Sequence, residues 1–290
     1  MTPLSGGRFT QTLATDISED GQVIVGIGNN SRPIRWTMAE GMVELQPGGS
    51  GAFGLTPDGS VIVGGPNAYR WTGDTVGVPL PLNAAKGISA DGSVIVGDTS
   101  EASGIRYAVR WTQATGTVSL GKLIATDVQS IATEVSADGS VIVGGSGSFT
   151  ARGAFRWTEA SGMVGLGDLP GGSVDSLAFD ISADGSVIVG VSDSGIPDSF
   201  VWTAASGMLN LRDVLAAGGA TGFENWTSLQ AYGISGDGST VVGYGRNPNG
   251  RDEAFVANIQ VPEPAAVSIA MFGVGAVAAR RRRMPLACRQ

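Results

Sequence analysis

Apolar and polar positions along the chain repeat as one short module. An apolar residue and a Ser or Thr precede an Asp-Gly pair, and an apolar run of the type Val-Ile-Val-Gly follows it. A loop then leads to a second apolar segment, such as Ala-Phe-Arg-Trp-Thr at 154–158. Asp-Gly favours the positive φ of a tight hairpin turn, and an unbroken apolar run is typical of a strand covered on both faces. The pattern therefore predicts short strands joined by tight turns.

The module occurs six times, with spacings between successive Asp-Gly pairs of 38, 33, 47, 46 and 53 residues. Each copy supplies a strand before Asp-Gly, the Val-Ile-Val-Gly strand, the Arg-Trp strand and a short strand after a second turn. Units of this kind suit the four-stranded blades of a propeller. The residues that mark the repeat are the turn glycines Gly21, Gly59, Gly92, Gly139, Gly185 and Gly238 and the tryptophans Trp36, Trp71, Trp111, Trp157 and Trp202.

These repeats predict an all-β chain with one six-bladed, propeller-like domain at 1–260. A stacked β-solenoid is the alternative, although solenoid repeats are usually shorter and more uniform. The sixth copy ends at 254–261 without a fourth strand, and residues 2–4 align with the fourth strand of an earlier copy. We therefore expect an N-terminal strand to close the last blade, which would remove exposed sheet edges.

Composition restricts the chemistry. The chain of 290 residues has no histidine and one cysteine, Cys288, so the commonest general base and metal ligand is absent. Before residue 265 there are 13 basic and 26 acidic residues, a balance that repels nucleic acid. We expect no catalytic residue, no metal and no cofactor. Paired carboxylates of the glycosidase type need no histidine, so a glycan-active enzyme (glycosidase or lyase) is the alternative. No acidic residue stands out against the repeat as half of such a pair.

Residues that recur at one place in every blade are expected to serve packing. We assign this role to the tryptophans and to the arginines that precede four of them, and we assign the Asp of each Asp-Gly pair to the turn. A binding surface needs different side chains at different points, and the loops at the other end of the blades vary. We therefore expect the functional face to be formed by the segments 27–33, 98–106, 145–153, 191–198, 212–230 and 245–253.

The repeats resemble a known family. ISADGSVIVG followed by AFRWT, SGM and LGDLPGG resembles the HAF family of bacterial extracellular repeats over about residues 2–260. The turn SADGSVIVG is also similar to the repeats of TolB-like propellers. The resemblance implies an extracellular location and no defined activity.

The C-terminus has a different pattern. A Pro-Glu-Pro segment precedes fifteen uncharged, mostly apolar residues at 265–279 and a cluster of arginines. This order resembles a PEP-CTERM sorting signal at 261–283, followed by a short cytoplasmic tail at 284–290. As a helix, 265–279 would span about 22 Å, less than the roughly 30 Å bilayer core, so we expect a transient contact with the inner membrane. The resemblance implies processing by an exosortase. The motif residues are Val261, Pro262, Glu263, Pro264, Arg280, Arg281, Arg282 and Arg283.

These observations favour an exported surface or matrix-associated protein that is not an enzyme. We expect it to bind or scaffold in an exopolysaccharide envelope, with exopolysaccharide or another surface protein as partner. The segment MTPLSGGRFTQ has neither the basic start nor the apolar run of a signal peptide, so we expect the true start to lie upstream.

Overall fold

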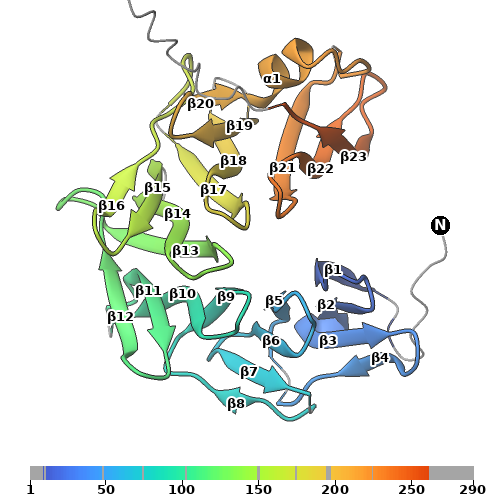
Figure 1. The fold of residues 1–290 in the computed structure, drawn as a ribbon, viewed down its shortest axis with the longest axis vertical. Coiled ribbons are helices and arrows are strands. Elements are labelled where there is room, and N and C mark those ends of the chain that lie inside the picture. Colours follow the sequence, from blue (N-terminus) through green and yellow to red (C-terminus); the bar gives the residue numbers. More distant parts are fainter. Residues whose placement is uncertain are drawn as a thin grey trace, which may run out of the picture.

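The computed structural model describes residues 9–260, except 10, 48, 74, 102, 149–150, 174, 194–196 and 224. The predicted six-bladed β-propeller is confirmed, because the strands form six sheets that follow one another around a ring (Figure 1). Five sheets have four strands and the last has three. Each sheet is a meander of consecutive antiparallel strands.

The first three blades comprise β1 (Leu13–Ile17), β2 (Val23–Gly28), β3 (Arg32–Thr37) and β4 (Gly41–Glu44); β5 (Ala52–Leu55), β6 (Val61–Gly64), β7 (Tyr69–Thr72) and β8 (Val78–Pro79); and β9 (Ala84–Ile88), β10 (Val94–Ser100), β11 (Arg106–Thr112) and β12 (Gly116–Gly121). The last three comprise β13 (Gln129–Val135), β14 (Val141–Gly147), β15 (Arg152–Thr158) and β16 (Gly162–Gly165); β17 (Ser176–Ile181), β18 (Val187–Asp193), β19 (Pro197–Thr203) and β20 (Gly207–Asn210); and β21 (Ser228–Ile234), β22 (Thr240–Arg246) and β23 (Asp252–Asn258).

The Asp-Gly turns join the first and second strand of every blade, as the sequence predicts. In the fourth blade, Ser136 Oγ donates to Asp138 Oδ1 over 2.7 Å and accepts from the Val141 amide over 3.0 Å. The Ser140 amide also donates to Asp138 Oδ1, over 2.9 Å. Gly139 has a φ of +74°, which Asp-Gly supplies at low cost. The turn thus satisfies its own polar groups.

The core lies between neighbouring blades, where the second strands are covered on both faces. Ile95, Val96, Ile142 and Val143 are completely buried. Among the repeat tryptophans, Trp71 is 1% exposed, whereas the other four are half-buried. The Trp71 indole also donates from Nε1 to the Gln46 carbonyl over 2.9 Å. Trp71 is therefore enclosed more completely than its counterparts.

Backbone hydrogen bonds link the turns of most successive blades; the second and third blades lack this bond, because Pro57 has no amide hydrogen to donate. The amide of the residue between Ser and Asp donates to the carbonyl at the same position in the next blade, as from Ala137 to Ala183 over 3.0 Å. The same bond joins Ala183 to Gly236 over 2.9 Å. Together with the buried strands, these bonds fix the angle between neighbouring blades.

The ring has one opening, between the sixth blade and the first (Figure 1). Ile17 on β1 is 54% exposed, although its counterparts in the next four blades are buried. Val242 on β22 is 43% exposed, and its counterparts in the other five blades are buried. The expected closing strand at 2–4 lies outside the described residues, as does the expected hydrophobic helix at 265–279.

Residues 212–230, expected as a loop, include most of a short helix, α1 (Leu211–Ala217). The Asn210 side chain caps α1 by accepting from the Arg212 amide over 2.8 Å, and Leu211, Val214 and Leu215 are buried. Seven residues are too few to show a helical period. A one-turn 3-10 segment, η1 (Asn29–Ser31), links β2 and β3. No helix in the described part of the chain is long and apolar enough to span a bilayer.

Candidate functional site

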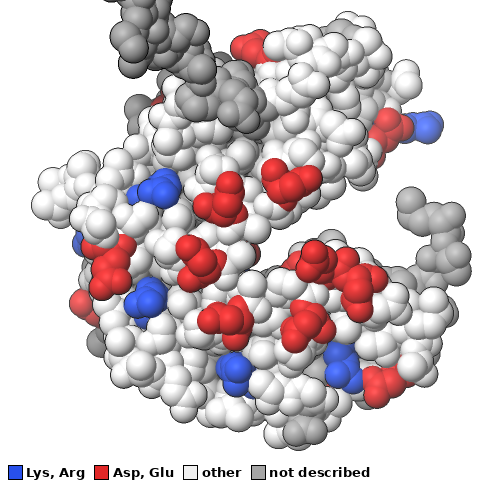
Figure 2. Space-filling model, in the orientation of Figure 1, with Lys and Arg blue, Asp and Glu red and all other residues white. Residues whose placement is uncertain are grey.

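Acidic side chains surround the centre of the ring, and basic side chains lie farther out (Figure 2). The turn aspartates are already engaged by the hydroxyl and amide groups of their own turns. These hydrogen bonds lower the pKa of Asp58 and of Asp237 to about 2. Because their acceptor oxygens serve the turns, these carboxylates have a structural role.

Three further carboxylates, from Asp16, Glu134 and Asp180, lie on the inner strands, in a central hollow of about 780 Å³. Asp16 accepts from the amide of Leu55 in the next blade over 2.9 Å, and Asp180 accepts from that of Ile234 over 2.7 Å. Burial raises the pKa of Asp16 and of Asp180 to about 6, and raises that of Glu134 well above its usual range. Among the described residues, no three His, Cys, Asp or Glu side chains are grouped so that they could hold a metal ion.

The opposite ends of the blades carry the variable loops, and two polar hollows lie there over the first three blades. Their volumes are about 560 and 450 Å³, and they share Ser50 and Pro66 as lining residues. Pockets of 300–1,000 Å³ suit small ligands. The first hollow is lined by Asn30, Ser31, Arg32, Glu44, Gln46, Gly49, Ser50 and Pro66. The second is lined by Ser50, Phe53, Gly65, Pro66, Asn83, Ala84, Lys86, Asp98, Ser100, Gly104 and Arg106.

Backbone strain accompanies these hollows. In the described chain, the non-glycine residues with positive φ are Asn30, Ser31 and Asn67, at 58°, 62° and 65°. All three lie between the second and third strands of the first two blades. Such conformations are costly and cluster where function requires a fixed geometry. This end of the propeller therefore differs from the regular turns at the other end.

The charges of the first hollow are satisfied within it. Glu44 is buried and accepts from Arg32 Nη1 with both carboxylate oxygens, each over 2.9 Å. The hollow thus offers amide, hydroxyl and guanidinium groups.

The second hollow contains a buried carboxylate with an unsatisfied oxygen. Asp98 is 2% exposed, and its Oδ2 has no hydrogen-bond partner among the described residues. Its Oδ1 lies 4.0 Å from Nη1 of Arg106. Asp98 is an acidic residue that stands out against the repeat, although as the partner of an arginine and not as half of a carboxylate pair. The counterparts of Asp98 after Val-Ile-Val-Gly or its variants are Ile27, Gly65, Gly145, Val191 and Tyr244.

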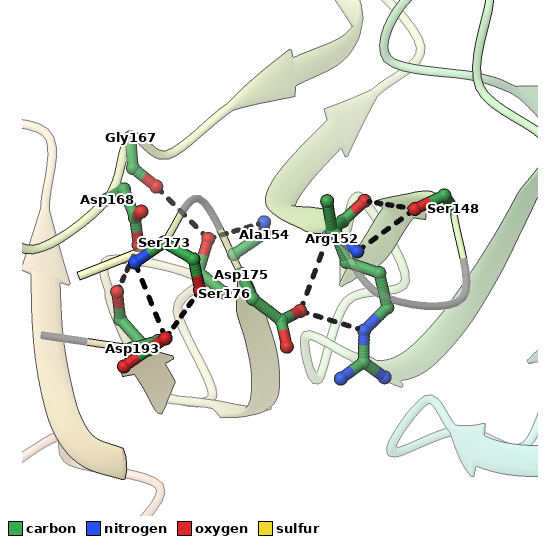
Figure 3. Close-up of polar contacts among 11 residues, drawn as sticks. Ser148, Arg152, Ala154, Gly167, Asp168, Ser173, Asp175, Ser176 and Asp193 are labelled. Carbon is green, nitrogen blue, oxygen red and sulfur yellow. Dashed lines mark hydrogen bonds and ion pairs between the residues drawn. The ribbon is translucent and has the colours of Figure 1, made fainter. Parts of the chain in front are cut away.

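At the same end of the fourth and fifth blades, the carboxylates accept hydrogen bonds from neighbouring side chains (Figure 3). Arg152 Nε donates to Asp175 Oδ1 over 3.1 Å, and Ser173 Oγ donates to Asp193 Oδ2 over 2.5 Å. Between the fifth and sixth blades, the equally buried Asp198 accepts from Arg212 and Asn210 with Oδ2. Asp98 differs from Asp198 in partners, not in burial.

Phe223 and Trp226, an aromatic pair within the segment 212–230, have a structural role. Phe223 and Trp226 pack against the core of the last two blades, and Phe223 also contacts Phe255 with ring centroids 5.7 Å apart. The sorting residues Val261–Pro264 and Arg280–Arg283 lie outside the described residues.

Comparisons with known proteins identify the tail and the fold. Residues 260–283 match the PEP-CTERM protein-sorting motif, as predicted. The fold is similar to that of a putative TolB from Agrobacterium tumefaciens, with a TM-score of 0.53 and 15% identity over 89% of this chain and 93% of that chain. It is also similar to that of TolB from Acinetobacter baumannii, with a TM-score of 0.50 and 16% identity over 87% of this chain and 62% of that chain. These identities show the fold alone.

No curated protein matches the chain in sequence. The resemblance to HAF repeats stays a prediction.

Proposed function

We propose that this chain is a surface-sorted propeller that binds an envelope polysaccharide without catalysing a reaction. The PEP-CTERM motif implies export, processing by an exosortase and sorting to the cell surface. In this proposal the segment 265–279 contacts the inner membrane only until processing, and the propeller then acts among surface polymers.

The observation that carries the proposal is the pair of adjoining polar hollows over the first three blades. Their side chains offer amides, hydroxyls and charged groups, which hydrogen-bond to the hydroxyls of a sugar. They lie on the variable face, and some of their lining residues come from two of the predicted segments, 27–33 and 98–106. Strained residues at Asn30 and Ser31 hold one wall in place.

A role in binding rather than catalysis is supported by the state of the carboxylates. Glu44 is held by Arg32, and the central carboxylates accept hydrogen bonds from backbone amides of neighbouring blades. A glycan-active enzyme remains the second candidate. The observation that favours it is the raised pKa of Asp16 and of Asp180, about 6, which suits a general acid.

Co-sedimentation of the full chain with polysaccharide from the envelope of the producing bacterium tests the proposal. We expect the protein to be retained, and Ser50→Leu, at the junction of the hollows, to weaken retention at least tenfold. The matched control is Glu159→Leu, on an exposed turn at the other end of a blade, which should bind normally. Equal retention of both variants would contradict binding at the hollows. Release of reducing ends would establish the enzyme instead.

A further inference from the structure

The second hollow brings together three charged side chains from one blade. Lys86 comes from β9, Asp98 from β10 and Arg106 from the start of β11. The wall beside them is fixed, because Asn83 Nδ2 donates to Ser100 Oγ over 2.7 Å and Asn83 Oδ1 accepts from the Ser100 amide over 3.1 Å. The charged groups are therefore held on a preorganised support.

The buried oxygen of Asp98 indicates a missing donor. A buried carboxylate is costly unless it is paired and hydrogen-bonded, and proteins rarely leave one partner out. Asp198 shows that this fold can satisfy such a group, since Arg212 and Asn210 both donate to its Oδ2. Asp98 lines a hollow of about 450 Å³, and its Oδ2 has no such donor among the described residues.

The charge of the hollow favours an anion. Its lining includes two cations, Lys86 and Arg106, and one carboxylate, Asp98, so the sum is +1. Burial lowers the pKa of Lys86, and the nearby Arg106 lowers it further, while Asp98 opposes both. A desolvated cation beside a second cation gains more from an anionic ligand than an exposed one would.

Neither Lys86 nor Asp98 belongs to the packing pattern of the repeat. No other copy has a charged residue at either position. Residues at the place of Lys86 are Thr15, Phe53, Thr133, Phe179 and Tyr232. Lys86 and Asp98 occur together in one blade and line one hollow. We therefore expect them to have a binding role that the other blades lack.

We infer that Lys86, Asp98 and Arg106 recognise a carboxylate with a neighbouring hydroxyl, the pair of groups that a uronic acid residue presents. The carboxylate pairs with Lys86 and Arg106, and the hydroxyl donates to Asp98 Oδ2. The inference rests on the proposed polysaccharide binding and names its sugar class. A free hydroxy acid has the same chemistry, so the test must separate the two sources.

Calorimetric titration of the full chain with trigalacturonate, maltotriose and lactate tests the inference. We expect binding of trigalacturonate only. Asp98→Asn, Lys86→Met and Arg106→Gln should each weaken it at least tenfold. Asp98→Asn should leave the protein at least as stable, because it removes an unsatisfied buried charge. The matched control, Asp198→Asn, should lower the melting temperature and leave trigalacturonate binding unchanged.

Equal binding of maltotriose, or full trigalacturonate binding by the Asp98 variant, would overturn the inference. Lactate binding as tight as that of trigalacturonate would support the chemistry and assign the site to a free hydroxy acid. If the envelope polysaccharide is retained but trigalacturonate is not bound, the inference fails and the proposed function stands. If trigalacturonate binds and the polysaccharide is not retained, the site stands and the proposed function fails.

Discussion

At the scale of single residues, the Asp-Gly turn shows how one local solution is reused. The Ser hydroxyl, the Asp carboxylate and two amides satisfy one another, so the turn depends little on its surroundings. The glycine is different, because its fit depends on the neighbouring blade. A Cβ added at Gly139 would lie 2.6 Å from Val94 Cγ2, whereas one added at Gly162 would meet nothing within 4 Å.

The two glycines give a matched test. Both have positive φ, +74° at Gly139 and +64° at Gly162, so alanine is strained at each. We expect Gly162→Ala to lower the free energy of unfolding by about 1–2 kcal/mol, the strain alone. Gly139→Ala adds the clash between blades and should cost about 1–3 kcal/mol more. Urea denaturation measures both. Equal losses would mean that the fourth and third blades do not pack as described.

Most of the turn and strand residues could be predicted from the sequence, because their recurrence in six copies identifies them without tertiary information. The sequence did not identify Asp98 as a candidate site residue, because the prediction relied on residues that recur in every blade and Asp98 occurs in one blade only. The available signal was a charged residue directly after Val-Ile-Val-Gly, where the other copies are apolar or small. The hollow around it could not be predicted, since it depends on loop paths such as the one that brings Ser50 beside Pro66.

At the scale of elements, equivalent strands have unequal surroundings. The third strands of the first five blades each carry a tryptophan, and the sequence suggests one packing role for all five. In the structure Trp71 is the one of these five that is completely enclosed, and the Gln46 carbonyl accepts a hydrogen bond from its indole. The helix α1 is a second departure, since its apolar side chains fill the edge of the last two blades.

Substitution of two tryptophans distinguishes these surroundings. Trp71→Ala should lower the free energy of unfolding by about 3–5 kcal/mol, because it removes buried area and leaves a cavity. Trp157 is half-buried against the core between the third and fourth blades, so Trp157→Ala should cost about 1–3 kcal/mol. Chemical denaturation measures the difference. A larger loss at Trp157 than at Trp71 would contradict the assigned burial.

At the scale of the whole molecule, two groups of carboxylates give stability opposite dependences on pH. The turn aspartates have lowered pKa values, about 2 at Asp58, so their contribution is present above pH 4 and lost as the pH falls toward 2. Asp16 and Asp180 have raised pKa values of about 6. Their contribution is present below about pH 4 and lost as the pH rises through 6.

The protein should therefore be most stable near pH 4–5. Between pH 4 and pH 7 the free energy of unfolding should fall by an amount on the order of 1–3 kcal/mol, because Asp16, Glu134 and Asp180 must ionise in the partly desolvated central hollow. Denaturation at a series of pH values measures this. The triple variant Asp16→Asn/Glu134→Gln/Asp180→Asn should flatten the fall above pH 4 and keep the fall toward pH 2. A wild-type maximum at or above pH 7 would contradict the assignment.

The opening of the ring is also a property of the whole molecule, and the repeat predicts which residues would meet if the ring closed. Ile17 on β1 and Val242 on β22 are exposed at the opening, whereas their counterparts in the second to fifth blades are buried, so the two faces are complementary. The amide of Ala183 donates to the Gly236 carbonyl over 2.9 Å. If the repeat continued from the sixth blade to the first, the amide of Gly236 would meet the carbonyl of Glu19. Closure also gives β23 a neighbour if residues 2–4 supply the missing strand.

We therefore expect a short bis-maleimide to link Glu19→Cys and Gly236→Cys within one chain, with Cys288→Ser as background. Ala183→Cys with Gly236→Cys is the positive control, because those residues are hydrogen-bonded, and Ala90→Cys with Gly236→Cys is the negative control across the ring. If residues 2–4 supply the missing strand, deletion of residues 2–8 should reduce the Glu19–Gly236 link and leave the positive control unchanged. Links that join two chains instead of one would show that a second copy covers these faces.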